Sequence, residues 1–281
     1  MDESTAPKVP QGVLYVATGA SYLAEARRSA QSVKSLHPEL PVCVVTDQGI
    51  GPDAQFDIVL PVANLPPTAD EHFLARDRVA YYRKIQPLLE SPFERTIFLD
   101  SDTWVAVPLD DLYQLLDQFE ILVTPAHVVY DYKFERDEAP FSAIPAAFGY
   151  FNTGLLAFRK CPAVERFLQL WIENYRQHTA QFTVNDQPAF RLTLFQDVVK
   201  FHVLPAHYNI VSWVPFIVPA GGKIVMLHGR NRWLQKWVNV FKGGAGPMIV
   251  GGVSFRAVMA YQLARILHKF SGWFRSQRET P

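Results

Sequence analysis

The stretch Arg95-Thr96-Ile97-Phe98-Leu99-Asp100-Ser101-Asp102-Thr103-Trp104-Val105 decides the fold. A short apolar run bounded by charged residues is typical of a buried parallel strand. Asp100 and Asp102 follow this run directly, so they lie at the carboxyl end of the strand, where open α/β sheets bind their ligands. Residues two apart in an extended strand face the same side, with Cα atoms roughly 6.5–7 Å apart.

Two like charges at that spacing are costly to bury unless a cation lies between them or water reaches them. The pair Asp100 and Asp102 therefore predicts a divalent metal site, and its hard oxygen ligands suit Mg²⁺ or Mn²⁺. A simpler interpretation is a strand that ends in a polar turn, with Asp102 capping the next segment.

The composition is that of a globular protein with a substantial core. The chain has 281 residues, of which 49% are hydrophobic and 13% aromatic. Its 27 basic and 27 acidic residues balance, which argues against a nucleic-acid-binding protein. Cys43 and Cys161 lack metal-ligand spacing and predict free thiols in a reducing compartment. Met1–Gln11 is unlike a signal peptide and no apolar run reaches about 18 residues, so we predict a soluble, cytoplasmic protein.

Strands alternate with helices along the first half of the chain. The predicted strands are Val13–Thr18, Pro41–Thr46, Phe56–Leu60, Arg95–Leu99 and Phe119–Thr124. The predicted helices are Ser21–Leu36 with a serine N-cap, a stretch over 70–90 that breaks near Pro87, and Asp110–Asp117. This rhythm predicts an α/β fold with a doubly wound, mostly parallel sheet over residues 13–125.

The second half is more irregular. We predict a strand at Tyr150–Phe158, helices at Pro162–His178 and Asp186–Phe195, and a late strand at Lys223–Leu227 that ends in His228. The run Asn185-Asp186-Gln187 also has the composition of an ordinary helix N-cap.

The first strand–helix turn, residues 17–22, is the other candidate ligand site. The chain contains no G-x-G-x-x-G and no G-x-x-x-x-G-K-[ST] motif, which argues against dinucleotide and P-loop sites. Backbone N–H groups of this small turn are suited to meeting a nucleotide at the helix N-terminus. An ordinary connecting turn is the alternative.

Several motifs occur in one order: Tyr81-Tyr82-Arg83-Lys84-Ile85-Gln86, then the Asp pair, Asn152-Thr153-Gly154, Asn185-Asp186-Gln187 and His228. In this order the chain resembles the retaining GT-A-fold glycosyltransferases of family 8, which contains glycogenin and bacterial lipopolysaccharide galactosyl- and glucosyltransferases. The resemblance runs from about Val13 to Trp233. It implies a mixed, mostly parallel sheet, with a leader at 1–12, a nucleotide-sugar-binding half at 13–125 and an acceptor-side half at 126–240.

The resemblance implies roles for single residues. Asp100, Asp102 and His228 are expected to bind Mn²⁺ or Mg²⁺ on the donor's diphosphate. The implied donor-binding residues are Thr18, Tyr22, Arg76 or Arg78, Lys84, Ser101 and Asn152, with Asp47 a weaker candidate. Asp186 and Gln187 are expected to steady the transferred sugar.

The implied activity is transfer of a hexose from UDP-glucose or UDP-galactose to a glycan, lipid-linked or protein acceptor, with retention of configuration. Metal and lysine stabilise the departing diphosphate by preorganised charge. Same-face attack by the acceptor is favoured over a covalent intermediate, since no carboxylate nucleophile is evident beyond Asp186.

The chain departs from the family pattern after His228. The family has a glycine three residues on and a lysine six on, whereas here Gly229 follows immediately and position 234 is Leu. Arg230, Arg232 or Lys236 must then clamp the phosphates. The usual acidic residue after the strand ending at Thr124-Pro125 is replaced by His127, or by Asp131 further on.

Two other classes compete with this prediction. A haloacid-dehalogenase-type phosphatase also ends a strand in D-x-D, but it requires threonine where this chain has Trp104. A nucleotide-sugar-binding protein without activity is the non-enzymatic alternative.

The tail over 241–281 is a separate element. Residues 249–275 combine apolar side chains at helical spacing with Arg256, Arg265 and Lys269. This pattern predicts an amphipathic C-terminal helix that packs on the catalytic domain or forms a homodimer. The alternative is peripheral contact with the inner face of a membrane.

Overall fold

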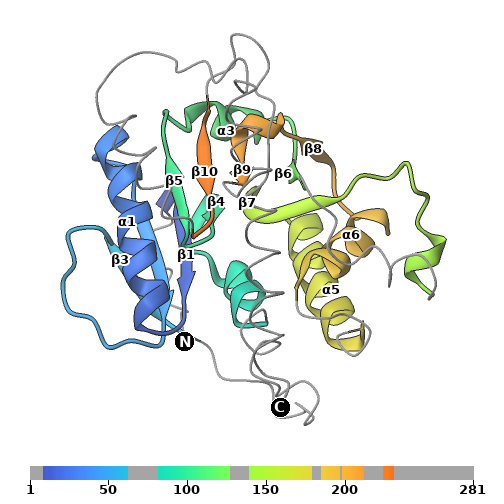
Figure 1. Ribbon diagram of the computed structural model, residues 1–281, viewed down its shortest axis with the longest axis horizontal. Helices are drawn as coiled ribbons and strands as arrows, with labels where there is room; N and C mark the ends of the chain where they lie inside the picture. Colours follow the sequence, from blue (N-terminus) through green and yellow to red (C-terminus); the bar gives the residue numbers. More distant parts are fainter. Residues whose placement is uncertain are drawn as a thin grey trace, which may run out of the picture.

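A seven-stranded mixed sheet forms the centre of the protein, as Figure 1 shows. The computed structural model describes residues 9–62, 82–126, 139–178, 185–196, 198–211 and 224–230. The strand order is β3-β2-β1-β4-β7-β6-β8. The strands are β1 (Val9–Ala17), β2 (Val42–Thr46), β3 (Ile58–Pro61), β4 (Phe93–Leu99), β6 (Ile121–Pro125), β7 (Phe151–Arg159) and β8 (Phe201–Val203). Only β7 runs antiparallel to its neighbours β4 and β6, which confirms the predicted mostly parallel sheet.

Helices cover both faces of this sheet. Successive residues of β1 pack into different cores: Leu14 joins the core under α5 (Pro162–His178), α6 (Gln187–Phe195) and the 3₁₀ helix η1 (Gln86–Glu90). Tyr15 joins the core under α1 (Ala20–Leu36) and α3 (Asp110–Leu115). This alternation follows from the two-residue period of a strand. The bounds of α5 agree with the predicted Pro162–His178.

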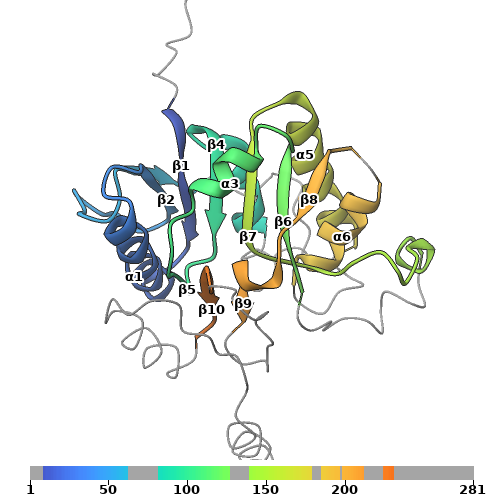
Figure 2. The ribbon, with the colours of Figure 1, turned by 90° about the horizontal axis from the view of Figure 1, so that it is seen from above.

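A second, three-stranded sheet was not anticipated from the sequence. It consists of β5 (Thr103–Val105), β10 (Met226–His228) and β9 (Ile210–Val211) in the order β5-β10-β9. In Figure 2 it lies beyond the end of the large sheet that is opposite to the start of β1. His228 pairs with Thr103 of β5, so this small sheet brings the late strand beside the Asp100–Asp102 turn.

The start of α1 differs from its prediction. The helix begins at Ala20 with Gly19 at the N-cap, so the predicted serine cap at Ser21 is wrong. The Gly19 N–H instead donates to Oδ1 of Asp47 (2.7 Å), and Gly19 has φ 94°, a left-handed conformation that suits glycine. β1 begins at Val9, four residues before its predicted start at Val13.

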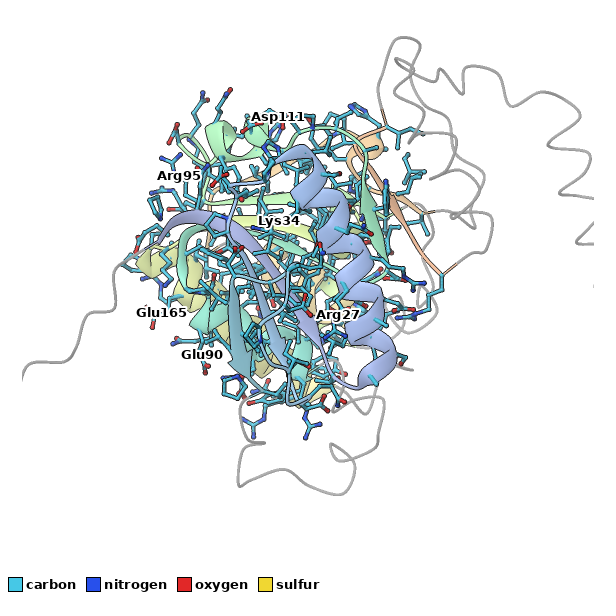
Figure 3. All side chains as sticks on the ribbon, turned by 90° about the vertical axis from the view of Figure 1, so that its left-hand side faces the viewer. Arg27, Lys34, Glu90, Arg95, Asp111 and Glu165 are labelled. Atoms are coloured by element: carbon cyan, nitrogen blue, oxygen red, sulfur yellow. The ribbon has the colours of Figure 1, made fainter. Side chains whose placement is uncertain are left out.

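Two ion pairs hold α1 to the segment that leads into β3. Arg27 lies 2.6 Å from Asp53 and Lys34 lies 2.7 Å from Asp57. Figure 3, in which α1 lies in front of the large sheet, labels both cations along this helix. The helix that borders the candidate ligand turn is thereby anchored along its length.

Some predictions concern residues outside the described ranges. These are Arg76, Arg78, His127, Asp131, Arg232, Lys236 and the tail over 241–281. Within the described part of the chain, no helix combines the length and apolarity needed to cross a membrane. Two remaining 3₁₀ helices, η2 (Phe141–Ala143) and η3 (Ala206–Tyr208), complete the described elements.

Candidate active site

Asp100 and Asp102 lie in a turn that joins β4 to β5 and is fixed at both ends. The Asp100 N–H donates to the Gly154 carbonyl on β7 (2.9 Å). The Thr103 hydroxyl donates to the Asp100 carbonyl (2.8 Å), and its oxygen lies 2.7 Å from the Ser29 hydroxyl of α1. The two carboxylates therefore project from a backbone that is hydrogen-bonded to a strand and a helix.

His228 approaches both carboxylates and completes what we call the carboxylate–histidine cluster (Asp100, Asp102, His228). Its Nε2 lies 3.6 Å from Oδ2 of Asp100 and 3.4 Å from Oδ1 of Asp102. One potential ligand atom from each residue lies within 4.8 Å of the others. The two carboxylates suit Mg²⁺ or Mn²⁺, the imidazole favours the transition metal Mn²⁺ of these two, and partial exposure of all three leaves an approach for an ion.

Two glycines allow His228 to take this position. Gly229 has φ 122° and donates its N–H to the Asp102 carbonyl (2.8 Å), which ties the end of β10 to the Asp turn. The imidazole also lies directly against Gly154, where an added Cβ would meet Cε1 of His228 at 2.2 Å and Nδ1 at 2.6 Å. A side chain at position 154 would displace the ring.

The carboxylates and the imidazole of this cluster shift one another's pKa values. Burial raises the pKa of Asp100, with Asp102 and Asp186 adding to the rise. Burial also opposes ionisation of Asp102, but the hydrogen bond and charge of His228, with the charge of Arg230, lower the pKa of Asp102 to about 2. Burial opposes charge on His228, yet Asp102 and Asp100 raise its pKa above the ordinary value of 6.5. A proton on His228 compensates the carboxylates when no metal is bound.

A second group of polar side chains lies next to the first, and we call it the lysine–carboxylate cluster (Lys84, Thr153, Asp186). The Lys84 ammonium lies 3.4 Å from Asp186 and donates to the Thr153 hydroxyl (3.0 Å). The Thr153 oxygen is 3.1 and 3.0 Å from the two carboxylate oxygens of Asp186. Lys84 also lies 3.0 Å from Oδ1 of Asp100, so it connects the two clusters.

Asp186 is placed by its helix and its backbone rather than by capping. It occupies the N-cap position of α6, but its side chain makes no capping bond. The neighbouring Asn185 accepts from the Gln187 N–H (3.0 Å) instead, and the Trp171 indole of α5 donates to the Asp186 carbonyl (3.3 Å). The side chain that accepts from the first turn of α6 is therefore that of Asn185. The Asp186 carboxylate binds Thr153 and Lys84 instead.

The predicted sugar-binding residues differ in how they are held. Asn152 accepts at Oδ1 from the Gly154 N–H (2.9 Å) and from the Asn209 amide (2.7 Å), so this oxygen faces the protein. Gln187 is half-buried at the first turn of α6.

The first strand–helix turn lies beside the same site. Tyr22 is 42% exposed, and the Arg230 guanidinium lies 4.8 Å from the centre of its ring. Glu25 accepts from Arg230 at 2.8 and 3.1 Å and from the Ser101 hydroxyl at 3.2 Å. These contacts bring α1, the Asp turn and the end of β10 together. Thr18, which directly follows β1, is half-buried.

Three residues of this site were not predicted from the sequence. Thr153 stood inside a quoted motif but was given no role, Glu25 lay on a helix face with no motif, and Asn209 had no signal at all. A search for a carboxylate one turn into α1 could have found Glu25. The contact of Asn209 with His228 depends on the small sheet and has no sequence signature.

Comparisons with known proteins agree with this architecture. Residues 10–119, less than half of the chain, match a family model described as "Mannosyltransferase putative". The fold is similar to that of the galactosyltransferase LgtC, solved with donor and acceptor sugar analogs, at TM-score 0.55 and 16% identity, covering 85% of this chain and 98% of that one. Mouse xyloside xylosyltransferase 1 is similar at TM-score 0.54 and 17% identity, covering 79% and 98%. No curated protein matches in sequence. The chain therefore has a GT-A fold and resembles the family 8 structures.

Proposed function

We propose that this protein is a metal-dependent glycosyltransferase that moves a hexose from UDP-glucose or UDP-galactose to a glycan, lipid-linked or protein acceptor, with retention of configuration. The observation that carries the proposal is the meeting of the two clusters through Lys84 at the carboxyl end of a GT-A sheet. Ligands bind at this edge in open α/β folds. The GT-A fold favours this function over a haloacid-dehalogenase-type phosphatase.

The donor side is assigned to the β1–α1 turn and the carboxylate–histidine cluster. Tyr22 offers an exposed ring for a nucleoside base, Thr18 lies in the turn that precedes α1, and Arg230 supplies a cation next to Asp102. Asp100, Asp102 and His228 would hold the metal, which neutralises charge that develops on the departing diphosphate. Lys84 adds a fixed positive charge at the same place.

The sugar side is assigned to Asn152, Asp186 and Gln187. The Asp186 side chain is only 2% exposed and both of its oxygens lie within hydrogen-bonding distance of Thr153. A carboxylate held in this way is better suited to fixing neighbouring groups than to attacking a sugar carbon. This supports same-face attack by the acceptor without a covalent enzyme intermediate.

A thermal-shift panel of nucleoside diphosphate sugars, each with and without Mn²⁺, tests the proposal. UDP-glucose or UDP-galactose should raise the melting temperature only when Mn²⁺ is present. Slow metal-dependent hydrolysis of the same donor would exclude an inactive binding protein. Stabilisation by no sugar nucleotide would contradict the proposal, and a product with inverted configuration by NMR would contradict retention.

A mannosyl donor is the second candidate, because the matched family model is described as a mannosyltransferase. GDP-mannose therefore belongs in the same panel. A larger shift with GDP-mannose than with either UDP-hexose would assign the donor to this second class while leaving the metal-dependent mechanism in place.

A further inference from the structure

Asn209 links His228 to two strands of the large sheet. Its side chain is fully buried immediately before β9. The amide nitrogen donates to Oδ1 of Asn152 (2.7 Å) and to the Thr124 hydroxyl (3.0 Å). The amide oxygen lies 3.0 Å from Nδ1 of His228. This one side chain therefore connects β6, β7 and β10.

The orientation of the Asn209 amide follows from a backbone group. Oδ1 of Asn152 accepts from the Gly154 N–H (2.9 Å), so the atom facing Asn209 is an oxygen and requires a donor. The Thr124 hydroxyl donates to the Asn152 carbonyl (3.1 Å), so its oxygen is also free to accept. Asn209 must direct its NH₂ group to both of them, and its oxygen is then directed at His228.

This orientation decides which ring nitrogen of His228 faces the carboxylates and becomes available to a metal ion once its proton has left. An amide oxygen accepts, so Nδ1 must hold the hydrogen, and Nε2 lies on the side of Asp100 and Asp102. Metal-bound histidines commonly donate their other ring N–H to such a partner, which fixes the tautomer and the orientation of the ring.

We propose that Asn209 is a positioning residue for metal binding: it holds His228 with the Nε2 lone pair directed between Asp100 and Asp102, and so sets the affinity of the site for Mn²⁺. This inference rests on the proposed metal role of His228. The ring has little room to adopt another orientation, because Gly154 packs against it on a second side. Without Asn209, the buried Nδ1–H loses its acceptor.

Mn²⁺ binding to the full-length chain without donor, followed by electron paramagnetic resonance of free Mn²⁺ at one fixed pH, tests the inference. Asn209→Leu, of similar size but without hydrogen-bonding groups, should weaken Mn²⁺ binding by about 10–100-fold. Asn209→Asp keeps an acceptor for Nδ1–H but loses the donor to Asn152, so it should bind Mn²⁺ more tightly than Asn209→Leu and less tightly than wild type. If Asn209→Leu does not fold, Asn209→Ala, which also lacks side-chain hydrogen-bonding groups, makes the same comparison.

Asn174→Leu is the matched control for loss of a buried asparagine. Asn174 is also buried, and its amide donates to Thr193 (2.9 Å) and Gln196 (2.8 Å) between α5 and α6. Both leucine variants should lower thermal stability, but only Asn209→Leu should weaken Mn²⁺ binding.

Electron spin-echo modulation from a coordinated ¹⁴N provides a readout that general destabilisation would not change. Wild type should show imidazole nitrogen on bound Mn²⁺, and Asn209→Leu, saturated with Mn²⁺, should lose much of this signal. Equal affinity and equal nitrogen coupling in wild type and Asn209→Leu would overturn the role of Asn209 alone. Wild type that binds no Mn²⁺ would refute the metal site, and the inference with it.

Discussion

In the carboxylate–histidine cluster the side chains of Asp100 and Asp102 are 24% and 15% exposed, whereas in the lysine–carboxylate cluster that of Asp186 is 2% exposed. The first cluster has two carboxylates around one imidazole, and burial raises the pKa of Asp100. The second pairs its carboxylate with the Lys84 ammonium. Adjacent groups of the same chemical type are therefore held differently.

The difference separates two tasks that a transfer site must perform. Asp100 and Asp102 remain accessible and need compensating positive charge, which suits groups that exchange a proton for a metal ion. Asp186 is closed and charge-balanced, which suits a group that fixes the geometry around it. Lys84 contacts both, so its removal should affect the two clusters in opposite ways.

Loss of a carboxylate from the carboxylate–histidine cluster should have the largest effect on turnover. Asp102→Asn removes a metal ligand and should lower metal-dependent donor hydrolysis by about 10³-fold or more, because both the metal and its charge are lost. Mn²⁺ binding and donor turnover measure the two effects separately. Asp117→Asn, which alters an exposed carboxylate paired with Arg95, is the control. Undiminished turnover in EDTA would contradict the division of tasks.

Removal of the shared cation should weaken turnover but strengthen metal binding. Lys84→Met eliminates an ammonium 3.0 Å from Asp100 that competes with an incoming ion, so donor-free Mn²⁺ affinity should rise several-fold. Turnover should fall by about 10²–10³-fold, since a preorganised positive charge is lost. Calorimetric titration measures the expected rise in Mn²⁺ affinity, and a donor hydrolysis assay measures the expected fall in turnover.

The control is Lys34→Met. Lys34 lies in the last turn of α1 and is paired with Asp57. The substitution should change neither quantity. Weaker Mn²⁺ binding in Lys84→Met would show that the lysine helps the carboxylate–histidine cluster to bind a metal ion instead of competing with it.

The lysine–carboxylate cluster should tolerate loss of its carboxylate charge better than the carboxylate–histidine cluster does. Asp186→Asn keeps the shape and one acceptor for Thr153, so Mn²⁺ affinity should stay within about threefold of wild type while turnover falls by about 10–100-fold. Titration with Mn²⁺ beside a turnover assay separates these outcomes. A loss of Mn²⁺ affinity as large as in Asp102→Asn would mean that the two clusters act as one.

The sequence predicted the elements that local patterns determine. The strand that ends at Leu99 and the helix Pro162–His178 both follow from hydrophobic patterns, and both are present. Asp100 and Asp102 were predicted from their place at the end of an apolar strand, and Lys84, Asp186 and His228 from the order of the family motifs. The structure brings these residues together.

What could not be predicted depends on contacts between distant segments. In the small sheet only the late strand, β10, overlaps a predicted strand, because β5 and β9 have three and two residues, too few for a detectable period. Ser21 had the composition of a cap, but the long-range bond from Gly19 to Asp47 sets the start of α1. The need for glycine at 154 appears only once His228 lies against it.

The smallest expected effect is a dependence of the stability of the metal-free protein on pH, which arises from the carboxylate–histidine cluster. The raised pKa of His228 means that its pairing with Asp102 stabilises the metal-free protein fully below pH 6.5 and is lost as the pH rises through the raised value. The lowered pKa of Asp102 adds stability above pH 3.8 that is lost as the pH falls toward about 2. Asp100 acts in the opposite direction, because its raised pKa makes its ionisation destabilising above pH 3.8.

Melting temperatures of wild type and His228→Gln in EDTA, compared between pH 5.5 and 8.5, measure the histidine part of this effect. The wild-type advantage should be a few degrees at the acidic end, since about 1 kcal/mol corresponds to ~2–4 °C in a domain of this size, and should shrink as the pH rises. With Mn²⁺ the trend should reverse, because metal binding requires a deprotonated Nε2. If the melting temperature changes with pH equally in both proteins without metal, the carboxylates do not keep His228 protonated. The carboxylate–histidine cluster then has no proton for a metal ion to replace.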